Sequence, residues 1–316
     1  MRALITGVTG FVGGYLARHL LNMDYEVWGT SRDGSCATNF GSKLKVVSMD
    51  FNEVDEVIET LNLIKPDFIY HLAGQSSVKL SWSNVQDTFD ANVSKTICLL
   101  EAVRKSDIAQ SVKILTVGSS EEYGRVEESD MPINESTLLR PISPYGITKA
   151  TVHMLVQQYV NSYQLQIIHA RPFNHIGPGQ SLGFVTSDFA YQVAQIEKGV
   201  MKPEIHVGNL EAQRDFTDVR DIVVAYEMLM KSGEIGNVYN VCSGKPVVIK
   251  DILLKNIEMS LNNNIKVIED PTKMRPSDIP LYMGDPTKIT KSTNWTSSIS
   301  LEESLIGILN YWRNEN

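Results

Sequence analysis

The sequence predicts an α/β protein with a doubly wound parallel sheet of the Rossmann type and a smaller, mostly C-terminal substrate-binding lobe. A glycine-rich turn follows the first strand, short apolar strands then alternate with helical patterns, and beyond about residue 172 Gly, Pro and polar residues loosen that alternation. The 316 residues suffice for two lobes. We expect a dinucleotide-binding domain over residues 1–172, to which residues 210–240 return, and the substrate lobe over most of 173–316.

The individual elements follow from the apolar pattern. Short β-branched or apolar runs predict strands at residues 4–6, 26–28, 45–49, 68–72, 112–117 and 166–170. Apolar residues that recur every three or four positions predict helices at 53–64, 88–105, 145–163 and 219–231. A last helix is expected to start at Ser300, which together with Glu303 forms a capping box. Strands that alternate with helices of this length indicate βαβ units.

Composition excludes several classes of protein. Lys and Arg number 29 against 37 Asp and Glu, and the resulting pI near 5.3 argues against a nucleic-acid-binding protein. No apolar run approaches the ~18 residues of a membrane span, and glycines interrupt the N-terminal apolar stretch, so we expect neither a membrane span nor a signal peptide. The 3 cysteines and 6 histidines lack metal-ligand spacing, which predicts no metal and favours reduced thiols in the cytoplasm.

The glycine-rich turn predicts a dinucleotide site. Gly7, Gly10 and Gly13 lie directly after the first strand and open the first helix. Glycine allows a tight turn and lets backbone N–H groups at the helix N-terminus approach a pyrophosphate. Glycine turns after strands are common and this spacing is one residue longer than the commonest pattern, so the place of the motif between strand and helix carries the prediction.

Two strand ends bear on which dinucleotide is bound. Ser31 and Arg32, at the end of the second strand, are able to donate hydrogen bonds to a 2′-phosphate, which favours NADP(H) and leaves NAD(H) as the alternative. Asp33 lies one residue beyond the position at which an acidic residue would bind a ribose 2′-hydroxyl, and it fits a solvated loop. Asp50, with Phe51 at the end of the third strand, is placed either to accept from an adenine amino group or to cap the following helix.

The segment from Ser143 to Lys149 predicts acid–base chemistry. Ser143 followed by Pro144 is a helix-start signal, so Tyr145 and Lys149 lie one turn apart on one helix face. A free phenol titrates at about 10, and a neighbouring ammonium favours the phenolate. The same lysine is able to bind a nicotinamide ribose. Such pairs are frequent on helix surfaces, so this one is informative only together with the dinucleotide turn.

An ordered series of motifs resembles the extended short-chain dehydrogenase/reductase family that acts on nucleotide sugars. The resemblance covers essentially the whole chain and rests on Gly7–Gly13, His71–Gln75, Ser119–Gly124, Tyr145-x-x-x-Lys149 and Arg171–Asn174. It implies a catalytic hydroxyl at Ser119, beside Tyr145 and Lys149, although Ser119 alone would also fit a polar strand end. It further implies cofactor contacts from Thr9, Phe11, Val12, Leu72, Ala73, Gly74, Gln75, Asn92, Val117 and Pro172.

The resemblance also implies how a GDP-sugar would be bound in the second lobe. Arg214 and Arg275 would hold the diphosphate, and Asp278 would accept from the nucleotide ribose. Taken alone, each arginine also fits a surface salt bridge. The other substrate residues that the resemblance implies are Asn174, Phe184, Val185 and Asn209.

Within the GDP-sugar branch, residues 175–180, 184–185 and 207–210 are similar to reductases. This similarity implies NADPH-dependent reduction of the C4 ketone of a GDP-4-keto-6-deoxyhexose to a GDP-6-deoxyhexose such as GDP-D-rhamnose. The alternative is a GDP-mannose 4,6-dehydratase, because Glu121 stands where dehydratases have the glutamate that abstracts a proton. A second alternative is a non-catalytic dinucleotide-binding regulator. The family also implies a homodimer joined through residues 88–105 and 145–163.

Overall fold

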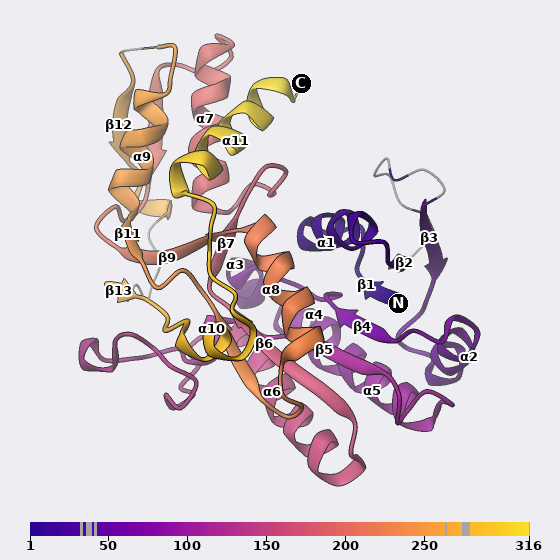
Figure 1. Ribbon diagram of the computed structural model, residues 1–316. Helices are drawn as coiled ribbons and strands as arrows, with labels where there is room; N and C mark the ends of the chain where they lie inside the picture. Colours follow the sequence, from indigo (N-terminus) through magenta and orange to yellow (C-terminus); the bar gives the residue numbers. More distant parts are fainter. Residues whose placement is uncertain (32–33, 36–39, 41–42, 263, 274–278, 316) are drawn as a thin grey trace.

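The computed structural model describes the chain except residues 32–33, 36–39, 41–42, 263, 274–278 and 316. In this described part, a seven-stranded parallel sheet with the strand order β10-β6-β5-β4-β1-β2-β3 forms the centre of the larger lobe (Figure 1). Its strands are β1 (Arg2–Thr6), β2 (Glu26–Ser31), β3 (Leu44–Ser48), β4 (Phe68–His71), β5 (Lys113–Val117), β6 (Gln166–Pro172) and β10 (Val238–Val241). The predicted doubly wound parallel sheet is confirmed.

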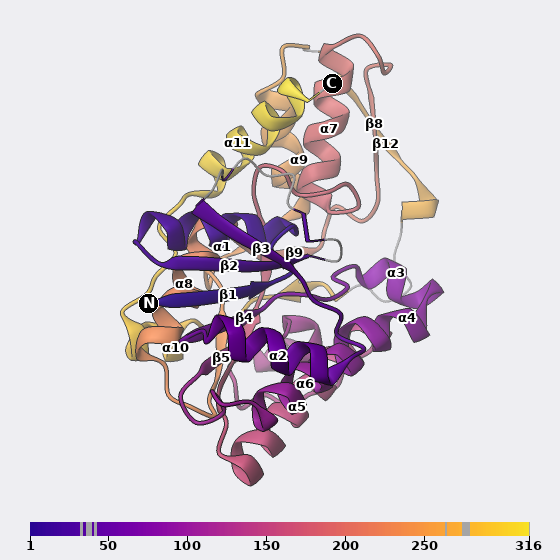
Figure 2. The same ribbon diagram turned by 90° about the vertical axis from the view of Figure 1, so that its right-hand side faces the viewer.

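Helices cover both faces of this sheet (Figure 2). One face carries α1 (Phe11–Asn22), α8 (Val219–Ser232) and α10 (Thr287–Thr293), and the other carries α2 (Val54–Ile64), α5 (Lys95–Lys105) and α6 (Pro144–Tyr163). β1 illustrates the reason, since Ala3 and Ile5 are fully buried in one core and Leu4 between them is fully buried in the other. A strand buried on both faces is apolar where it is buried, as the central residues Ala3, Leu4 and Ile5 of β1 are.

The smaller lobe has a core of its own. Its helices α7 (Val185–Glu197), α9 (Ile249–Glu258) and α11 (Leu301–Asn314) pack around buried aliphatic residues. Short strands complete it: β7 (Asn174–Ile176), β9 (Gln213–Asp218), β11 (Pro246–Val248) and β13 (Leu281–Tyr282) in one sheet, and β8 (Glu204–Val207) with β12 (Lys266–Glu269) in another. The chain enters this lobe three times, because α8 and β10, and later α10, return to the main sheet between its parts.

One predicted helix is interrupted. The predicted range 88–105 contains the end of α4 (Val85–Phe89), a π-helical turn over Asp90–Ser94, and then α5. The wide turn places Asn92 in the interior, where its Nδ2 donates to Thr148 Oγ1 at 3.0 Å and its Oδ1 accepts from the Gln75 N–H at 2.7 Å. Apolar periodicity does not reveal such a turn, because its hydrogen bonds change while the amphipathic pattern continues. A short helix, α3 (Val78–Ser83), precedes α4.

The last helix starts where it was predicted, but only half of the expected capping box is present. Ser300 Oγ accepts from the Glu303 N–H at 3.1 Å. The Glu303 carboxylate instead accepts from Arg220 Nη1 on α8 at 3.0 Å, since that ion pair competes with the local cap. None of the helices in the described part of the chain has both the length and the apolar character needed to cross a bilayer.

Candidate active site

The glycine turn between β1 and α1 has the shape of a phosphate cradle. Gly7 has φ +72°, and a Cβ placed there would lie 3.0 Å from backbone atoms of Ala73. A Cβ on Gly13 would lie 2.3 Å from the Gly7 carbonyl oxygen. In the described structure no side chain caps α1, whose N-cap residue is Gly10. The first-turn N–H groups are therefore able to bind an anion, so the turn fits a pyrophosphate.

The strand ends that bear on the adenosine half are only partly described. Ser31 is the last residue of β2 and is half-buried, whereas Arg32 and Asp33 lie outside the described residues. Asp50 is exposed, and its Oδ1 accepts from the Asn52 N–H at 3.0 Å. Because α2 begins at Val54 with Glu53 as its N-cap, the interpretation of Asp50 as the helix cap was wrong.

The loop after β4 is fixed by Asn92. A Cβ on Gly74 would lie 2.8 Å from Asn92 Oδ1, which also accepts from the next N–H along the loop. Asn92 is only 2% exposed, and both its amide oxygen and nitrogen bond to protein groups. Its part in a cofactor site is therefore to hold the loop Leu72–Gln75 against α6.

A buried histidine that the sequence showed only as part of a motif links the same elements. Thr96 Oγ1 donates to the Asn92 carbonyl at 2.6 Å, so it must accept from His71 Nε2 at 3.0 Å. His71 Nδ1 then accepts from Thr6 Oγ1 at 2.9 Å, and Thr6 Oγ1 accepts from the Ala73 N–H at 3.1 Å. Burial lowers the pKa of His71 to about 3, which keeps the ring neutral. This chain of bonds connects the end of β1 to the π-helical turn.

Ser119 lies just beyond β5, at the carboxyl end of the sheet. It is the N-cap of the short 3-10 turn Ser120–Glu122, and its Oγ accepts from the Glu121 N–H at 3.2 Å. The Ser119 side chain also lowers the pKa of the Tyr145 phenol, so the two hydroxyl groups lie close together. The pairing of Ser119 with Tyr145 that the family resemblance implied is therefore present in the structure.

Tyr145 and Lys149 occupy the first turns of α6, as predicted. Ser143 Oγ accepts from the Gly146 N–H at 3.0 Å, and Pro144 is the first residue of the helix. Lys149 Nζ lies 5.7 Å from the centroid of the Tyr145 ring and donates to the Val117 carbonyl at 2.9 Å. Val117 and Pro172 end β5 and β6, so these groups meet at the carboxyl edge, where doubly wound sheets bind ligands.

The electrostatics of the pair differ from the expectation. Burial raises the pKa of Tyr145, the hydrogen bond with Ser119 opposes this, and the charges of Glu121 and Glu122 add to it. Burial also lowers the pKa of Lys149 to about 8. The expected lowering of the Tyr145 pKa by Lys149 is not found, because desolvation dominates for both groups. Tyr145 is therefore a protonated hydrogen-bond donor at neutral pH.

The candidate substrate residues lie on the smaller lobe around β9. Asn174 is exposed and donates to the Asp215 carbonyl at 3.3 Å, and Arg214 Nη1 donates to the Ile279 carbonyl at 2.6 Å. Asn209 and Arg214 are half-buried, as are Phe184, the N-cap of α7, and Val185, its first residue. Arg275 and Asp278 lie outside the described residues.

A tyrosine that sequence analysis missed joins the two lobes at the turn Ser119–Glu122, which we name the catalytic turn after the hydroxyl expected at Ser119. Tyr282 pairs with Arg214 in the β13–β9 register, and its hydroxyl donates to the Ser120 carbonyl at 2.7 Å. The charges of Arg214 and Glu121 both act on the buried Tyr282 phenol, which places the arginine near the catalytic turn. No local pattern marked Tyr282, since its two-residue strand is too short to show periodicity.

A second group of residues missed from the sequence lies beneath Ser119. Glu122, His169 and Arg171 are 0%, 0% and 1% exposed. The available signal was the place of His169 and Arg171 in β6, whose other residues are apolar apart from Gln166 at its start. A charged side chain within a buried strand needs a buried partner.

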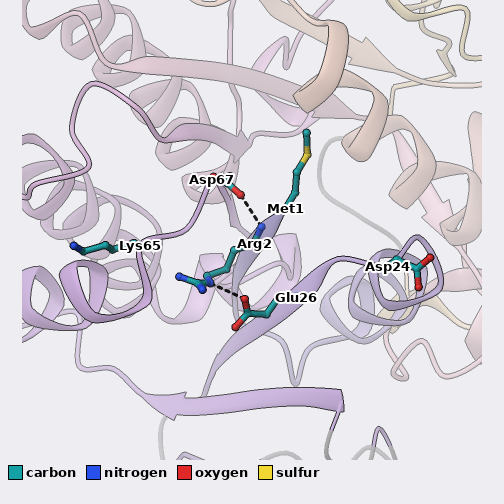
Figure 3. A pocket seen from close by; sticks show the side chains of 6 residues that line it. All are labelled: Met1, Arg2, Asp24, Glu26, Lys65 and Asp67. Atoms are coloured by element: carbon teal, nitrogen blue, oxygen red, sulfur yellow. Dashed lines mark hydrogen bonds and ion pairs between the residues drawn. The ribbon is translucent and has the colours of Figure 1, made fainter.

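A pocket at the opposite edge of the sheet is not the candidate site (Figure 3). It lies at the amino ends of β1 and β2, where Arg2 Nε pairs with Glu26 at 2.9 Å and Asp67 accepts from the Arg2 backbone N–H at 2.7 Å. The charges of Arg2 and Glu26 thus satisfy each other. Ligands of doubly wound sheets bind at the carboxyl ends instead.

Comparisons with known proteins agree with this geometry. A family model described as GDP-mannose 4,6 dehydratase matches residues 4–306. GDP-6-deoxy-D-mannose reductase from Pseudomonas aeruginosa is 31% identical over 98% of this chain and 97% of its own length, and GDP-mannose 4,6 dehydratase from Homo sapiens is 29% identical over 95% and 88%. The structure of RMD from Pseudomonas aeruginosa complexed with NADPH has a TM-score of 0.83 and 30% identity, and covers 99% of this chain and 98% of that chain. The chain therefore belongs to the GDP-mannose 4,6 dehydratase family, within the extended short-chain dehydrogenases/reductases.

Proposed function

We propose that the protein reduces the C4 ketone of a GDP-4-keto-6-deoxyhexose to a GDP-6-deoxyhexose such as GDP-D-rhamnose, with NADPH favoured over NADH. The observation that carries the proposal is a buried, protonated Tyr145 that lies next to Ser119 and Lys149. The 31% identity to a GDP-6-deoxy-D-mannose reductase, and the NADPH in the structure of a 30% identical neighbour, support the choice of substrate and cofactor.

The glycine turn and the strand ends are the groups that would hold the dinucleotide. Backbone N–H groups at the start of α1 would bind the pyrophosphate, and Ser31 would contact the 2′-phosphate that distinguishes NADPH. The loop Leu72–Gln75, fixed by Asn92, would line the nicotinamide half. Lys149, which donates to the Val117 carbonyl, would bind the ribose. Bound NADPH supplies the hydride.

The side chains of this protein carry out the proton transfer to the substrate oxygen. Tyr145 gives its proton to the oxygen of the former ketone. The raised pKa of Tyr145 keeps the phenol protonated at neutral pH, so the proton is present to be given. Ser119 Oγ already accepts from the Glu121 N–H, so its own proton is available to hydrogen-bond the substrate oxygen or the phenol. The Lys149 ammonium then stabilises the phenolate that forms.

The substrate would lie between the catalytic turn and the smaller lobe. Arg214 would pair with the diphosphate, together with Arg275, and Asp278 would accept from the nucleotide ribose. Asn174, Phe184, Val185 and Asn209 would complete the contacts. Arginine suits this role because its planar fork binds phosphate bidentately.

The test is turnover with defined substrates. We expect the purified protein to oxidise one NADPH per molecule of GDP-4-keto-6-deoxymannose, with a product heavier by two hydrogens in mass spectrometry. Incubation with GDP-mannose alone is the control. Loss of water from GDP-mannose without added reductant would overturn the reductase and establish a dehydratase, and dinucleotide binding without turnover of either substrate would establish a regulator.

The dehydratase is the second candidate because of Glu121. Glu121 is half-buried in the same 3-10 turn as Ser119, and its charge acts on Tyr145. A carboxylate there would be able to abstract a proton from the bound sugar. The matched variant Glu121→Gln separates the two functions, since it should abolish loss of water but leave ketone reduction largely intact.

We further propose that the protein is a homodimer in a reducing cytoplasm. Ile147 and Met154 on α6 and Ile97 on α5 are large apolar side chains with 42%, 60% and 37% exposure. A second copy packing on these helices would cover them. The described cysteines, Cys98 and Cys242, are free and buried. Light scattering on wild type and Met154→Glu tests the dimer, which the charge should dissociate.

A further inference from the structure

A buried carboxylate lies directly beneath the catalytic turn. Glu122 Oε2 accepts from Arg171 Nε at 2.6 Å, and Oε1 accepts from the Ser119 backbone N–H at 2.9 Å. His169 Nε2 lies 3.1 Å from the same Oε1 and donates to it, since a carboxylate is only an acceptor. Three donors from two elements therefore fix the carboxylate, and one of them belongs to Ser119.

The ionisation of this cluster is well defined. Burial alone would raise the pKa of Glu122, but His169 and Arg171 outweigh it and lower the pKa to about 2. Burial lowers the pKa of His169, which is therefore neutral at pH 7 with its proton on Nε2. Its Nδ1 accepts from Thr116 Oγ1 at 2.9 Å. The charges present are thus one carboxylate and one guanidinium.

Each of the three guanidinium nitrogens of Arg171 has a hydrogen-bond partner. Arg171 Nη1 donates to the Tyr123 hydroxyl at 3.0 Å, and Nη2 donates to His153 Nδ1 at 2.8 Å. The Tyr123 hydroxyl in turn donates to Asn240 Oδ1 on β10 at 2.7 Å. Breaking one side of a buried pair is costly, so this network holds the carboxylate in one position.

The backbone above the carboxylate is shaped to admit it. A Cβ on Gly118 would lie 1.9 Å from Glu122 Oε1 and 2.4 Å from His169 Nε2. Only glycine therefore lets the chain between β5 and Ser119 pass this close. The bond from the Ser119 N–H to Glu122 Oε1 belongs to the capping box of the 3-10 turn, and the buried pairing with His169 and Arg171 fixes the carboxylate that closes this box.

We propose that Glu122 is a positioning residue: held by Arg171 and His169, it fixes the backbone of Ser119 so that the serine hydroxyl meets Tyr145 and the substrate oxygen. The Ser119 N–H is committed to Glu122 and the Ser119 Oγ accepts from the Glu121 N–H. The hydroxyl proton is the one donor of Ser119 left for the reaction. This inference rests on the proposed function.

The Glu122 carboxylate also has an electrostatic effect, which an uncharged residue holding the backbone in the same place would lack. The charge of Glu122 raises the pKa of both Lys149 and Tyr145. Removing it should therefore move the alkaline limb of the pH–rate profile to lower pH. The charged and titratable groups around Glu122 are His169 and Arg171 from β6, His153, Tyr145 and Lys149 from α6, Tyr123 next to it, and Tyr282 from β13.

The test compares Glu122→Gln with Glu227→Gln, a change of the same kind at a site away from the catalytic turn. Glu227 is 4% exposed on α8, where it accepts from the Tyr25 hydroxyl at 3.0 Å and pairs with Lys231. For Glu122→Gln we expect kcat to fall about ten- to hundredfold, as for loss of a charged hydrogen bond. NADPH affinity and KM should change less than about threefold, and the alkaline limb should move to lower pH. Glu227→Gln should retain wild-type kcat and pH profile.

Gly118→Ala provides a second variant that keeps every charge. Its methyl group would displace the carboxylate, so kcat should fall while the pH profile stays closer to wild type. If Glu122→Gln does not fold, Gly118→Ala decides: wild-type kcat in a folded protein overturns the proposal. Wild-type kcat and pH profile in Glu122→Gln would overturn it equally.

Failure of the proposed function is a different observation. In that case the wild-type protein does not oxidise NADPH with the keto-sugar nucleotide, and the same variants are compared on loss of water from GDP-mannose. There too, a positioning role requires kcat to fall in Glu122→Gln. An equal rate would overturn it.

Discussion

The two sides of the candidate site are built differently. On the sheet side, Ser119, Tyr145 and Lys149 lie at strand and helix ends; Tyr145 is buried, and Ser119 and Lys149 are half-buried and hydrogen-bonded to backbone groups. On the smaller lobe, Asn174 is exposed and Arg214 is half-buried on a short strand. The comparison teaches that the proposed reacting groups lie at the carboxyl edge of the main sheet, whereas the proposed contacts to the sugar nucleotide come from side chains of the smaller lobe. Changes on the first side should mainly lower kcat, and changes on the second should mainly raise KM.

The largest effect is expected for Tyr145→Phe. This change removes the proton donor but keeps the ring, so kcat should fall by about 10²–10⁴-fold while NADPH affinity stays unchanged. Steady-state kinetics and a fluorescence titration with NADPH measure the two quantities. The matched control is Tyr70→Phe, because the Tyr70 hydroxyl is buried without a hydrogen-bond partner in the described structure. Wild-type turnover of Tyr145→Phe would remove Tyr145 from the role.

Arg214→Ala tests the other side. Loss of a charged hydrogen bond to the diphosphate should raise KM for the sugar nucleotide about ten- to hundredfold, with a much smaller change in kcat. Arg220→Ala is the control, since that arginine pairs with Asp218 at the end of β9 and with Glu303 on α11. A large drop in kcat at unchanged KM would contradict the division between the two sides.

The pH dependence of activity tests the role of Lys149 on the sheet side of the site. Lys149 acts as a cation and its pKa is lowered to about 8, so activity should be lost as pH rises through that value. The Tyr145 pKa is raised, so the tyrosine does not set this limb. Lys149→Arg keeps its charge at all accessible pH values, and kcat/KM of this variant should not fall near pH 8. An unchanged limb in the variant would assign the titration to another group.

The smallest effect is expected at the contact between the two sides. Tyr282→Phe removes the hydrogen bond to the Ser120 carbonyl, which still accepts from the Tyr123 N–H at 3.0 Å. The free energy of unfolding in urea should fall by about 0.5–1.5 kcal/mol, with a severalfold loss of kcat. Tyr70→Phe again serves as the control. A loss of kcat as large as that of Tyr145→Phe would mean that the Tyr282 hydroxyl takes part in the reaction itself.

Much of the fold could be predicted, because its signals are local. The glycine turn, the Ser143 cap and the i, i+4 spacing of Tyr145 and Lys149 each depend on residues a few positions apart. The π-helical turn at Asp90–Ser94 and the loss of half the Ser300 capping box were not predictable in this way. Each results from a contact with a distant helix, α6 in the first case and α8 in the second.

The sequence by itself determined the family, the parallel sheet and which residues we propose for the chemistry. Only the tertiary structure decided how those residues are held and how they titrate. Glu122 meets His169 across 47 positions, and Tyr282 meets Ser120 across 162. Burial, which sets the pKa of Tyr145 and Lys149, likewise depends on every element packed around them. Desolvation and distant hydrogen bonds exist only after the chain has folded, so no local pattern encodes them.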